Sequence, residues 1–441
     1  MKSLMLGLTA LAIFVFFVCL LISRQPRRTY LLFLIYAMPF IDMKITAAQF
    51  GSLTVFDGLS YFMLFMNYKD FLSIFKVNRF YFITFCSLVF LLILGSLTSF
   101  FITNSLLSFL SVIPVFIYGR LLILECVNNP EFVRSITGAL KVTCLTSIAF
   151  LAAQLVVGLD LRFYSELNQN VLDPNGIRYP SYFHDSQKYA QFLTMLSFLF
   201  LFNPKDTQKP AIRNLLLFLV VIGAMFLTGG RSAFLGLCAG LFFLLLFAGM
   251  HYKKYIIAGC LTCGIVIALF SQSFIMFNRQ DEFNDSFDFR AAIWRDAFRI
   301  YQDHPFLGIG IGNYQDFVSR YSQDQFLVLE NEIIWLDQPE NGYLKILTEF
   351  GAPGFLVAFT LVLGPIIGAM RAWFKHQTDG RVLLLIAPVV SWLVSFISLY
   401  SITDRRNLLV LSTLVALLIY SSNRLKLTHE SPAVTTNHEP V

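Results

Sequence analysis

The chain has 441 residues, of which 56% are hydrophobic and only 14% are charged, and its mean hydropathy is +0.67. Because soluble proteins carry about 25% charged residues, this composition excludes an ordinary soluble protein and predicts an all-α, polytopic membrane protein. The net charge of +6 does not indicate a nucleic-acid partner, because the basic residues lie in short connections between apolar runs.

Apolar runs follow one another along most of the chain, and each is about long enough to span a bilayer as a helix. The first run, residues 3–23, ends in Arg24-Gln-Pro-Arg27-Arg28 rather than in a small-residue cleavage site, which predicts a retained helix. Further runs lie at about residues 29–47, 52–68, 80–102, 106–127, 136–158, 185–202, 212–229, 232–250, 254–276, 342–370, 382–402 and 407–422. We therefore expect about 12–13 transmembrane helices.

Lysine and arginine collect on alternate connections, which the positive-inside rule places in the cytoplasm. The long polar connections 159–184 and 277–341 are then expected on the outer face, which in a Gram-negative cell is the periplasm. Arg405 and Arg406 are exceptions, on a short outer turn beside Asp404. The predicted parts are an N-terminal helical bundle (1–276), a large periplasmic loop with an amphipathic helix (277–341), C-terminal transmembrane helices (342–427) and a disordered tail (428–441).

Two patterns that often mark cofactor or metal sites are interpreted otherwise here. Cys260 and Cys263 have the spacing of a redox or metal pair, but they lie in an apolar run without histidine or acidic neighbours, which favours packing. The glycines of Gly308-Ile-Gly310-Ile-Gly312 lack the strand and helix of a nucleotide site, so we expect them to let the outer loop turn tightly. The sequence predicts neither a cofactor nor a metal ion.

Arg231 and Arg290 are candidates for binding an anion at the outer face. Arg231 follows Thr228-Gly-Gly between two apolar runs, where snorkelling to the interface and binding an anionic group are equally supported. A helix is expected over about 289–302, which would put Arg290 at a helix N-terminus that favours phosphate. The alternative is that Arg290 only borders the apolar face of a helix lying on the membrane.

The expected helix has a candidate N-terminal cap and one apolar face. Asp285 or Asp288 would cap it, and its apolar stripe would consist of Arg290, Ile293, Trp294, Ala297 and Tyr301.

Glu340 and Asn341 stand where the outer loop returns to the membrane. Spacing alone favours Asn341 as a helix cap beside a solvated Glu340. The alternative is that the Glu340 carboxylate accepts a proton from an incoming hydroxyl group. His184 and His304 are substitute bases, although His304 precedes a proline in a loop and is expected at the surface.

Three segments in this order resemble the O-antigen ligase and O-antigen polymerase (Wzy-type) superfamily: Thr228-Gly-Gly-Arg-Ser-Ala-Phe-Leu-Gly236, Arg290-x-x-x-Trp294 with Pro305-Phe-Leu-Gly308 downstream, and Asn341-Gly-Tyr-Leu-x4-Glu349-x-Gly351-x2-Gly354. The resemblance covers about residues 175–365, including Arg178-Tyr-Pro-Ser-Tyr-Phe-His184. It implies a GT-C-like glycosyltransferase that takes a glycan from undecaprenyl diphosphate, without nucleotide sugar, cofactor or required metal.

The resemblance also implies roles for single residues. Arg231 and Arg290 would hold the diphosphate and stabilise the leaving group, with Glu340 as the catalytic base. The remaining implied substrate-binding residues are Arg178, His184, Trp294, Asn341 and Tyr343.

The position of Glu340 bears on which member of the family is expected. Ligases carry a histidine there, so Glu340 favours a polymerase, whose acceptor is a second lipid-linked glycan, over a ligase, whose acceptor is lipid A–core. A chain-length regulator is a candidate protein partner. A flippase of lipid-linked oligosaccharide is an alternative of another class, which the lack of duplicated halves disfavours.

Overall fold

The structure is a computed structural model, and it describes residues 2–42, 53–72, 79–164, 167, 171–173, 176–202, 212–249, 253–254, 256–261, 264, 282–321, 326–329, 332–335, 338–376 and 380–430. Within these residues the strands are confined to two antiparallel hairpins. One pairs β1 (Leu172–Asp173) with β2 (Gly176–Ile177), and the other pairs β3 (Phe326–Leu329) with β4 (Glu332–Trp335). The predicted all-α fold is confirmed.

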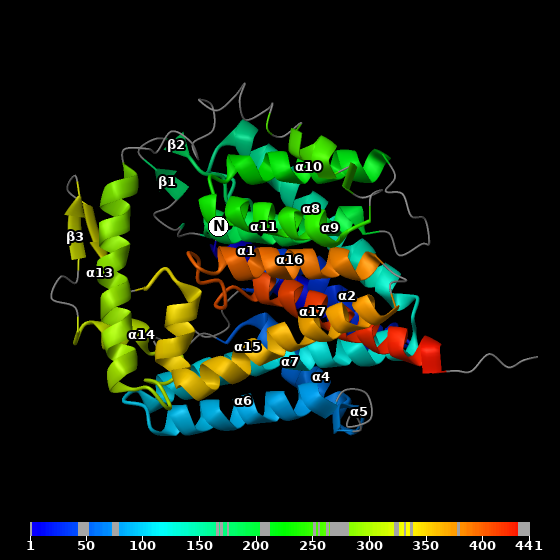
Figure 1. Cartoon of the computed structure of the whole chain (residues 1–441), viewed down its shortest axis with the longest axis horizontal. Coiled ribbons are helices and arrows are strands. Elements are labelled where there is room, and N and C mark those ends of the chain that lie inside the picture. The colour runs from blue at the N-terminus through cyan, green and yellow to red at the C-terminus, as the bar shows by residue number, and fades with distance from the viewer. Residues whose placement is uncertain are drawn as a thin grey trace, which may run out of the picture.

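The remaining elements are helices, and most of them run side by side as a bundle (Figure 1). They are α1 (Lys2–Ile22), α2 (Pro26–Tyr36), α3 (Met38–Ile41), α4 (Val55–Met66), α5 (Tyr68–Leu72), α6 (Arg79–Leu97), α7 (Ile102–Asn128), α8 (Phe132–Val157), α9 (Ser186–Leu201), α10 (Ile212–Leu227), α11 (Arg231–Phe247), α13 (Glu282–Asp303), α14 (Tyr314–Val318), α15 (Gly342–His376), α16 (Arg381–Ser395) and α17 (Arg405–Glu430). Helix α13 stands across one end of the bundle, which we call the α13 end (Figure 1).

Several helices have the length and composition of membrane spans. Among the described residues, five are long and apolar enough to cross a membrane: α6, α7, α8, α15 and α17 as far as Asn423. Helices α4, α10, α11 and α16 are also apolar but shorter, and so is the segment Ala10–Ile22 of α1. The chain is therefore a polytopic membrane protein. The predicted total of 12–13 spans stays a prediction, because most of the run 254–276 lies outside the described residues.

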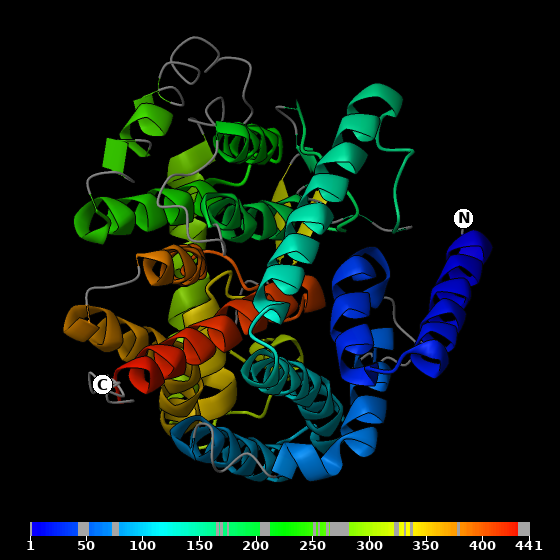
Figure 2. The ribbon, with the colours of Figure 1, turned by 90° about the vertical axis from the view of Figure 1, so that its right-hand side faces the viewer.

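The interior of the bundle is built around α9, α16 and α17, whose side chains are mostly buried. Helices α1 and α6 lie at the edge (Figure 2) and expose large apolar side chains such as Leu21 and Phe80. Exposed apolar side chains on peripheral helices are what a lipid environment requires, because lipid solvates them directly.

The apolar run 29–47 is not one continuous helix. Helix α2 ends at Tyr36, Ala37 forms a turn and α3 begins at Met38. Pro39 lies in the first turn of α3. Proline has no N–H group and its ring clashes with the carbonyl four residues earlier, so the helix has to restart here.

Helix α13 begins at Glu282, about two turns before the predicted start. Asp285 and Asp288 therefore lie inside the helix and do not cap it. The expectation that Arg290 sits at a helix N-terminus is wrong, because two turns of helix precede it.

The predicted amphipathic character of α13 is confirmed for its described side chains. Ile293, Ala297 and Ile300 are buried, whereas Arg295 and Arg299 on the opposite face are exposed. The helix thus covers the end of the bundle with its apolar stripe.

Helix α15 is interrupted at Gly351, whose φ of 67° is left-handed. The interruption frees backbone groups that a neighbouring loop satisfies. Ile309 N–H donates to the Thr348 carbonyl at 3.0 Å and Gly310 N–H donates to the Glu349 carbonyl at 3.1 Å. The loop after α13 is therefore joined to the break in α15.

The glycines of this loop have the conformations that the sequence predicts. Gly308, Gly310 and Gly312 have φ values of 66°, 88° and 81°. A Cβ atom on Gly308 would lie 2.5 Å from the Glu349 carbonyl carbon. The predicted tight turn is confirmed, and it serves close packing against α15.

Candidate active site

An ion pair joins α13 to the segment that begins α15. Arg290 Nε donates to Glu340 Oε2 at 3.0 Å, and the two side chains are 36% and 42% exposed. Trp294, one turn further along α13, donates from its indole Nε1 to the Pro339 carbonyl at 2.9 Å. Residues i and i+4 of one helix face therefore hold the two residues that precede Asn341.

Asn341 caps α15, as the spacing predicts. Its side-chain oxygen accepts hydrogen bonds from the N–H groups of Tyr343 at 3.0 Å and Leu344 at 3.2 Å. The next residue, Gly342, donates its N–H to the Phe396 carbonyl at 3.0 Å. The start of α15 is thus fixed to the end of α16.

Tyr343 strengthens the same attachment. Its hydroxyl donates to the Leu393 carbonyl at 2.7 Å, and its ring stacks on Phe359 with centroids 5.0 Å apart. We infer that Tyr343 positions the start of α15, since its hydroxyl bonds to α16.

The backbone of Glu340 is strained. Its φ of 46° lies in the left-handed region, which costs a non-glycine residue about 1–2 kcal/mol. The Trp294 bond on one side and the Asn341 cap on the other keep the conformation in place. Strain of this kind persists where the surroundings over-determine it, and it gathers at functional sites.

The end of α16 is also a neighbour of α9 and α11. Gln191 of α9 donates its side-chain N–H to Ser395 Oγ at 2.6 Å, and Gly236 of α11 leaves no room for a Cβ atom beside the Ser391 carbonyl. Arg231, the first residue of α11, is half-buried and lies two residues after Gly229, which has a φ of 69°. Arg231 therefore lies toward the end of α16 that is fixed to the start of α15. Its convergence with Arg290 on one diphosphate stays a prediction.

Arg178 and His184 lie on the segment between β2 and α9. Arg178 is buried and its backbone N–H donates to the Val171 carbonyl at 3.0 Å. His184 is half-buried, and its ring packs edge-on against Tyr164 with centroids 5.8 Å apart. Burial, assisted by the charge of Lys188, lowers the pKa of His184 to about 4, so the ring is neutral at pH 7.

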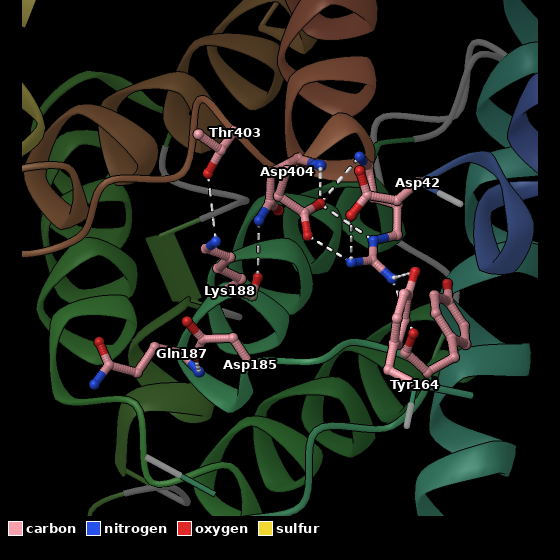
Figure 3. Close-up of polar contacts among 10 residues, drawn as sticks. Asp42, Tyr164, Asp185, Gln187, Lys188, Thr403 and Asp404 are labelled. Carbon is pink, nitrogen blue, oxygen red and sulfur yellow. Dashed lines mark hydrogen bonds and ion pairs between the residues drawn. The ribbon is translucent and has the colours of Figure 1, made fainter. Parts of the chain in front are cut away.

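A buried group of charges lies beside His184, and the sequence did not predict it. We call Asp42, Tyr164, Tyr182, Asp404 and Arg406 the Arg406 cluster (Figure 3). The Arg406 side chain is 0% exposed. Its Nε donates to Asp404 Oδ1 at 3.2 Å and its Nη2 donates to Asp404 Oδ2 at 2.6 Å.

The other donors of Arg406 reach three further segments. Nη2 also donates to Asp42 Oδ2 at 3.2 Å, and Nη1 donates to the Tyr164 hydroxyl at 3.1 Å and to the Tyr182 carbonyl at 2.9 Å. All five N–H donors of the guanidinium are then used. Arg406 is therefore a buried link between α17 and the connections around residues 42, 164 and 182.

Charge compensation keeps Asp404 ionised inside this cluster. Burial by itself raises the pKa of Asp404, but the Arg406 guanidinium outweighs it and holds the pKa at about 2. Asp42, His184 and Asp404 have ligand atoms within 4.8 Å of one another, a spacing that suits a metal ion. Because Arg406 already pairs with both carboxylates, we assign them to the ion-pair cluster.

A second buried ion pair, Lys345 and Glu349, lies on α15 after Glu340, and the sequence did not predict it. Lys345 Nζ donates to the Gln338 side chain, lies 4.0 Å from Glu349 Oε1 and sits 4.2 Å from the centre of the Tyr400 ring. Glu349 Oε1 accepts the Tyr314 N–H at 3.3 Å. These contacts connect the residues before Glu340 to the glycine loop. The helical spacing of Lys345 and Glu349 was the signal for this pair.

Comparison with known proteins identifies the segment that carries this geometry. Residues 216–359 match the family model described as O-antigen ligase. This range contains Arg231, Arg290 and Glu340. The resemblance that the motifs indicate is confirmed over these residues.

A curated protein, the teichuronic acid biosynthesis protein TuaE of Bacillus subtilis (strain 168), is 24% identical over 277 residues. The aligned part covers 58% of this chain and 54% of TuaE. The chain thus spans about half the length of this relative.

Proposed function

We propose that the protein is a membrane glycosyltransferase that polymerises oligosaccharide repeat units carried on undecaprenyl diphosphate, for O-antigen, capsule or exopolysaccharide. The observation that carries this proposal is the junction of α13 and α15. There a guanidinium and a carboxylate pair within reach of solvent, next to a strained Glu340 backbone. The family match over the same residues supports it.

The pair suggests how the reaction begins. An exposed ion pair contributes only about 0–1 kcal/mol, so Arg290 exchanges Glu340 readily for a diphosphate, which its forked donors fit well. The exchange frees the Glu340 carboxylate at the moment when the donor substrate is bound. Substrate binding therefore activates the base.

The chemical step then follows from these two groups. Glu340 accepts the proton of an acceptor sugar hydroxyl, and the hydroxyl oxygen attacks the anomeric carbon of the donor. The bond from that carbon to the phosphate oxygen breaks, and undecaprenyl diphosphate leaves with the electron pair. Arg290 and Arg231 stabilise the charge on the leaving group, and this step calls for no metal ion.

The other predicted residues have supporting roles in the proposal. Trp294 and Asn341 hold the backbone on either side of Glu340. Tyr343 keeps the start of α15 on α16. Arg178 and His184 are proposed to contact the glycan from the segment before α9.

We place the α13 end in the periplasm of an inner-membrane protein. The predicted connections rich in lysine and arginine fall between the opposite ends of the helices, which the positive-inside rule assigns to the cytoplasm. A lipid-linked glycan would then reach the site from the outer leaflet. A chain-length regulator would dock from the same side.

The second candidate is a ligase that transfers the glycan to lipid A–core. The description of the matching family favours it, whereas Glu340 in place of the histidine of ligases favours a polymerase. Glycans from a deletion strain separate these functions on a gel. Loss of a polymerase leaves single repeat units on the cell surface, and loss of a ligase leaves polymer on undecaprenyl diphosphate.

The same deletion strain tests the alternative that the protein is a flippase of lipid-linked oligosaccharide. Loss of a flippase would trap the repeat units on the cytoplasmic side of the membrane. A deletion strain with normal surface polymer would contradict every one of these functions.

A further inference from the structure

Arg120 of α7 is a buried cation that the reaction does not use. The residue is 3% exposed, and all three guanidinium nitrogens lack a hydrogen-bond partner among the described residues. Its guanidinium carbon lies 5.9 Å from the centre of the Phe82 ring. A cation over an aromatic ring is favourable, but it satisfies none of the five N–H donors.

Two other buried arginines, unlike Arg120, are paired with carboxylates. Arg406 pairs with Asp404 and Asp42, and Arg405 pairs with Asp57 at 3.3 Å. An arginine cannot lose its proton at physiological pH, so burial without an anion is costly. The site around Arg120 therefore lacks the negative group that its chemistry demands.

The position of Arg120 indicates where that group comes from. Helices α6 and α7 pack through Phe85 and Phe116, whose ring centroids are 4.5 Å apart. One turn further along α7, Arg120 meets Phe82, in the first turn of α6, which begins at Arg79. Arg120 thus lies at the end of the α6–α7 contact that is remote from α13.

This part of α7 packs against α6. Helix α6 lies at the periphery (Figure 2), and its outer face exposes Phe80 and Ile83. A molecule with an apolar body and an anionic head would reach the guanidinium from this edge, between the first turn of α6 and α7. Membrane lipids have this form, and a phosphate accepts several hydrogen bonds from a guanidinium.

We propose that Arg120 binds the phosphate of a membrane phospholipid that enters between α6 and α7 at the end remote from α13. The phosphate replaces the missing anion and accepts N–H groups of the guanidinium. The lipid then acts as a structural ligand that holds α6 on α7. Intramembrane charges of this kind mark binding sites, because their cost has to be offset by a partner.

The test measures lipid binding by the full-length protein in a phosphate-free maltoside detergent. Phosphatidylglycerol is titrated while thermal unfolding is followed, and bound phosphorus per protein is determined after washing. The wild-type protein should gain melting temperature with added lipid and retain phosphorus. Arg120→Met should raise the apparent Kd for the lipid about 10-fold or more, because it removes a charged hydrogen-bonding group.

Matched variants separate the specific site from general effects of charge. Arg134→Met removes an exposed arginine from the first turn of α8 and should leave the apparent Kd unchanged. Arg120→Lys keeps the cation and should give an intermediate apparent Kd, which covers the case that Arg120→Met fails to fold. Stabilisation by inorganic phosphate as strong as that by the lipid would assign the site to free phosphate and overturn the lipid proposal.

Two results would overturn the lipid site itself. One is an equal apparent Kd for wild type and Arg120→Met. The other is a wild-type protein that retains no phosphorus and does not respond to phosphatidylglycerol. Neither measurement involves glycan transfer, so its failure would leave the proposed reaction untouched.

Discussion

Two ion-paired arginines near the α13 end of the molecule have opposite surroundings. Arg290 and Glu340 are 36% and 42% exposed and form one contact, whereas Arg406 and Asp404 are both 0% exposed and every donor of Arg406 is used. An exposed pair can exchange its partner at a cost of about 0–1 kcal/mol. A buried cluster cannot exchange its partners in this way. The Arg290–Glu340 pair therefore suits a role in the reaction, whereas the Arg406 cluster suits a structural role that holds the outer connections together.

The comparison predicts its largest effect at Arg406. Arg406→Met leaves the buried Asp404 and the partly buried Asp42 without their counter-ion and should lower the free energy of unfolding by about 3–5 kcal/mol. Thermal unfolding in detergent and the amount of protein in the membrane would both report the loss. Arg299→Met, at a side chain that is 64% exposed, is the control and should change neither. Equal stability of Arg406→Met and Arg299→Met would contradict the structural role of the Arg406 cluster.

The next effect belongs to Arg290, where activity and stability should separate. Arg290→Ala should lower the rate of glycan transfer about 100- to 1000-fold, the usual effect of losing a group that stabilises transition-state charge. Its melting temperature should stay near that of wild type, because the pair is exposed. Arg295→Ala, on the exposed face of the same helix, should keep normal transfer. A large loss of stability in Arg290→Ala would remove the distinction from Arg406.

The break in α15 supplies a backbone test of the junction. Gly351→Ala should cost about 1–3 kcal/mol of stability, because the residue has a φ of 67° and a Cβ atom would meet the Phe306 carbonyl. Gly223→Ala is the control, since nothing lies within 4 Å of its Cβ position in α10. Thermal unfolding of both variants measures the difference. An unaffected Gly351→Ala would contradict the close packing of the loop on α15.

The smallest predicted effect is a pH dependence beside the Arg406 cluster. The pKa of His184 is lowered to about 4 in the fold, below the value of about 6.5 for a free histidine. Between these values the unfolded chain binds more protons, so His184 makes the protein lose stability as pH falls from about 6.5 to 4. His184→Gln should show a shallower loss in melting temperatures across this range. If the melting temperatures of wild type and His184→Gln fell equally between pH 6.5 and 4, His184 would not be held neutral in the fold.

The same two regions show how far the sequence predicts the structure. Long apolar runs predict helices reliably, because a bilayer leaves the backbone few alternatives. Asn341 as a cap and the three glycines as a tight turn were also predicted, since both depend on local chemistry. The start of α13 was placed too late, because an aspartate can lie in the first turns of a helix as well as cap it.

Contacts between distant segments were beyond the sequence. The motifs single out Arg290 and Glu340, but their pairing spans 50 residues and depends on how α13 lies on the bundle. The partners of Arg406 are 364, 242 and 224 residues away, at Asp42, Tyr164 and Tyr182. One signal was available: two arginines on the outer side, against the positive-inside rule, need a reason such as buried acidic partners.

The most direct test of the central claim is the rate of repeat-unit transfer by purified Glu340→Gln in reconstituted membranes, measured together with its melting temperature. The glutamine keeps the size of the side chain and removes only its ability to accept a proton. The account predicts transfer at least about 100-fold slower than wild type, with an unchanged melting temperature. Transfer at the wild-type rate would contradict the assignment of Glu340 as the base and with it the proposed role of the α13–α15 junction.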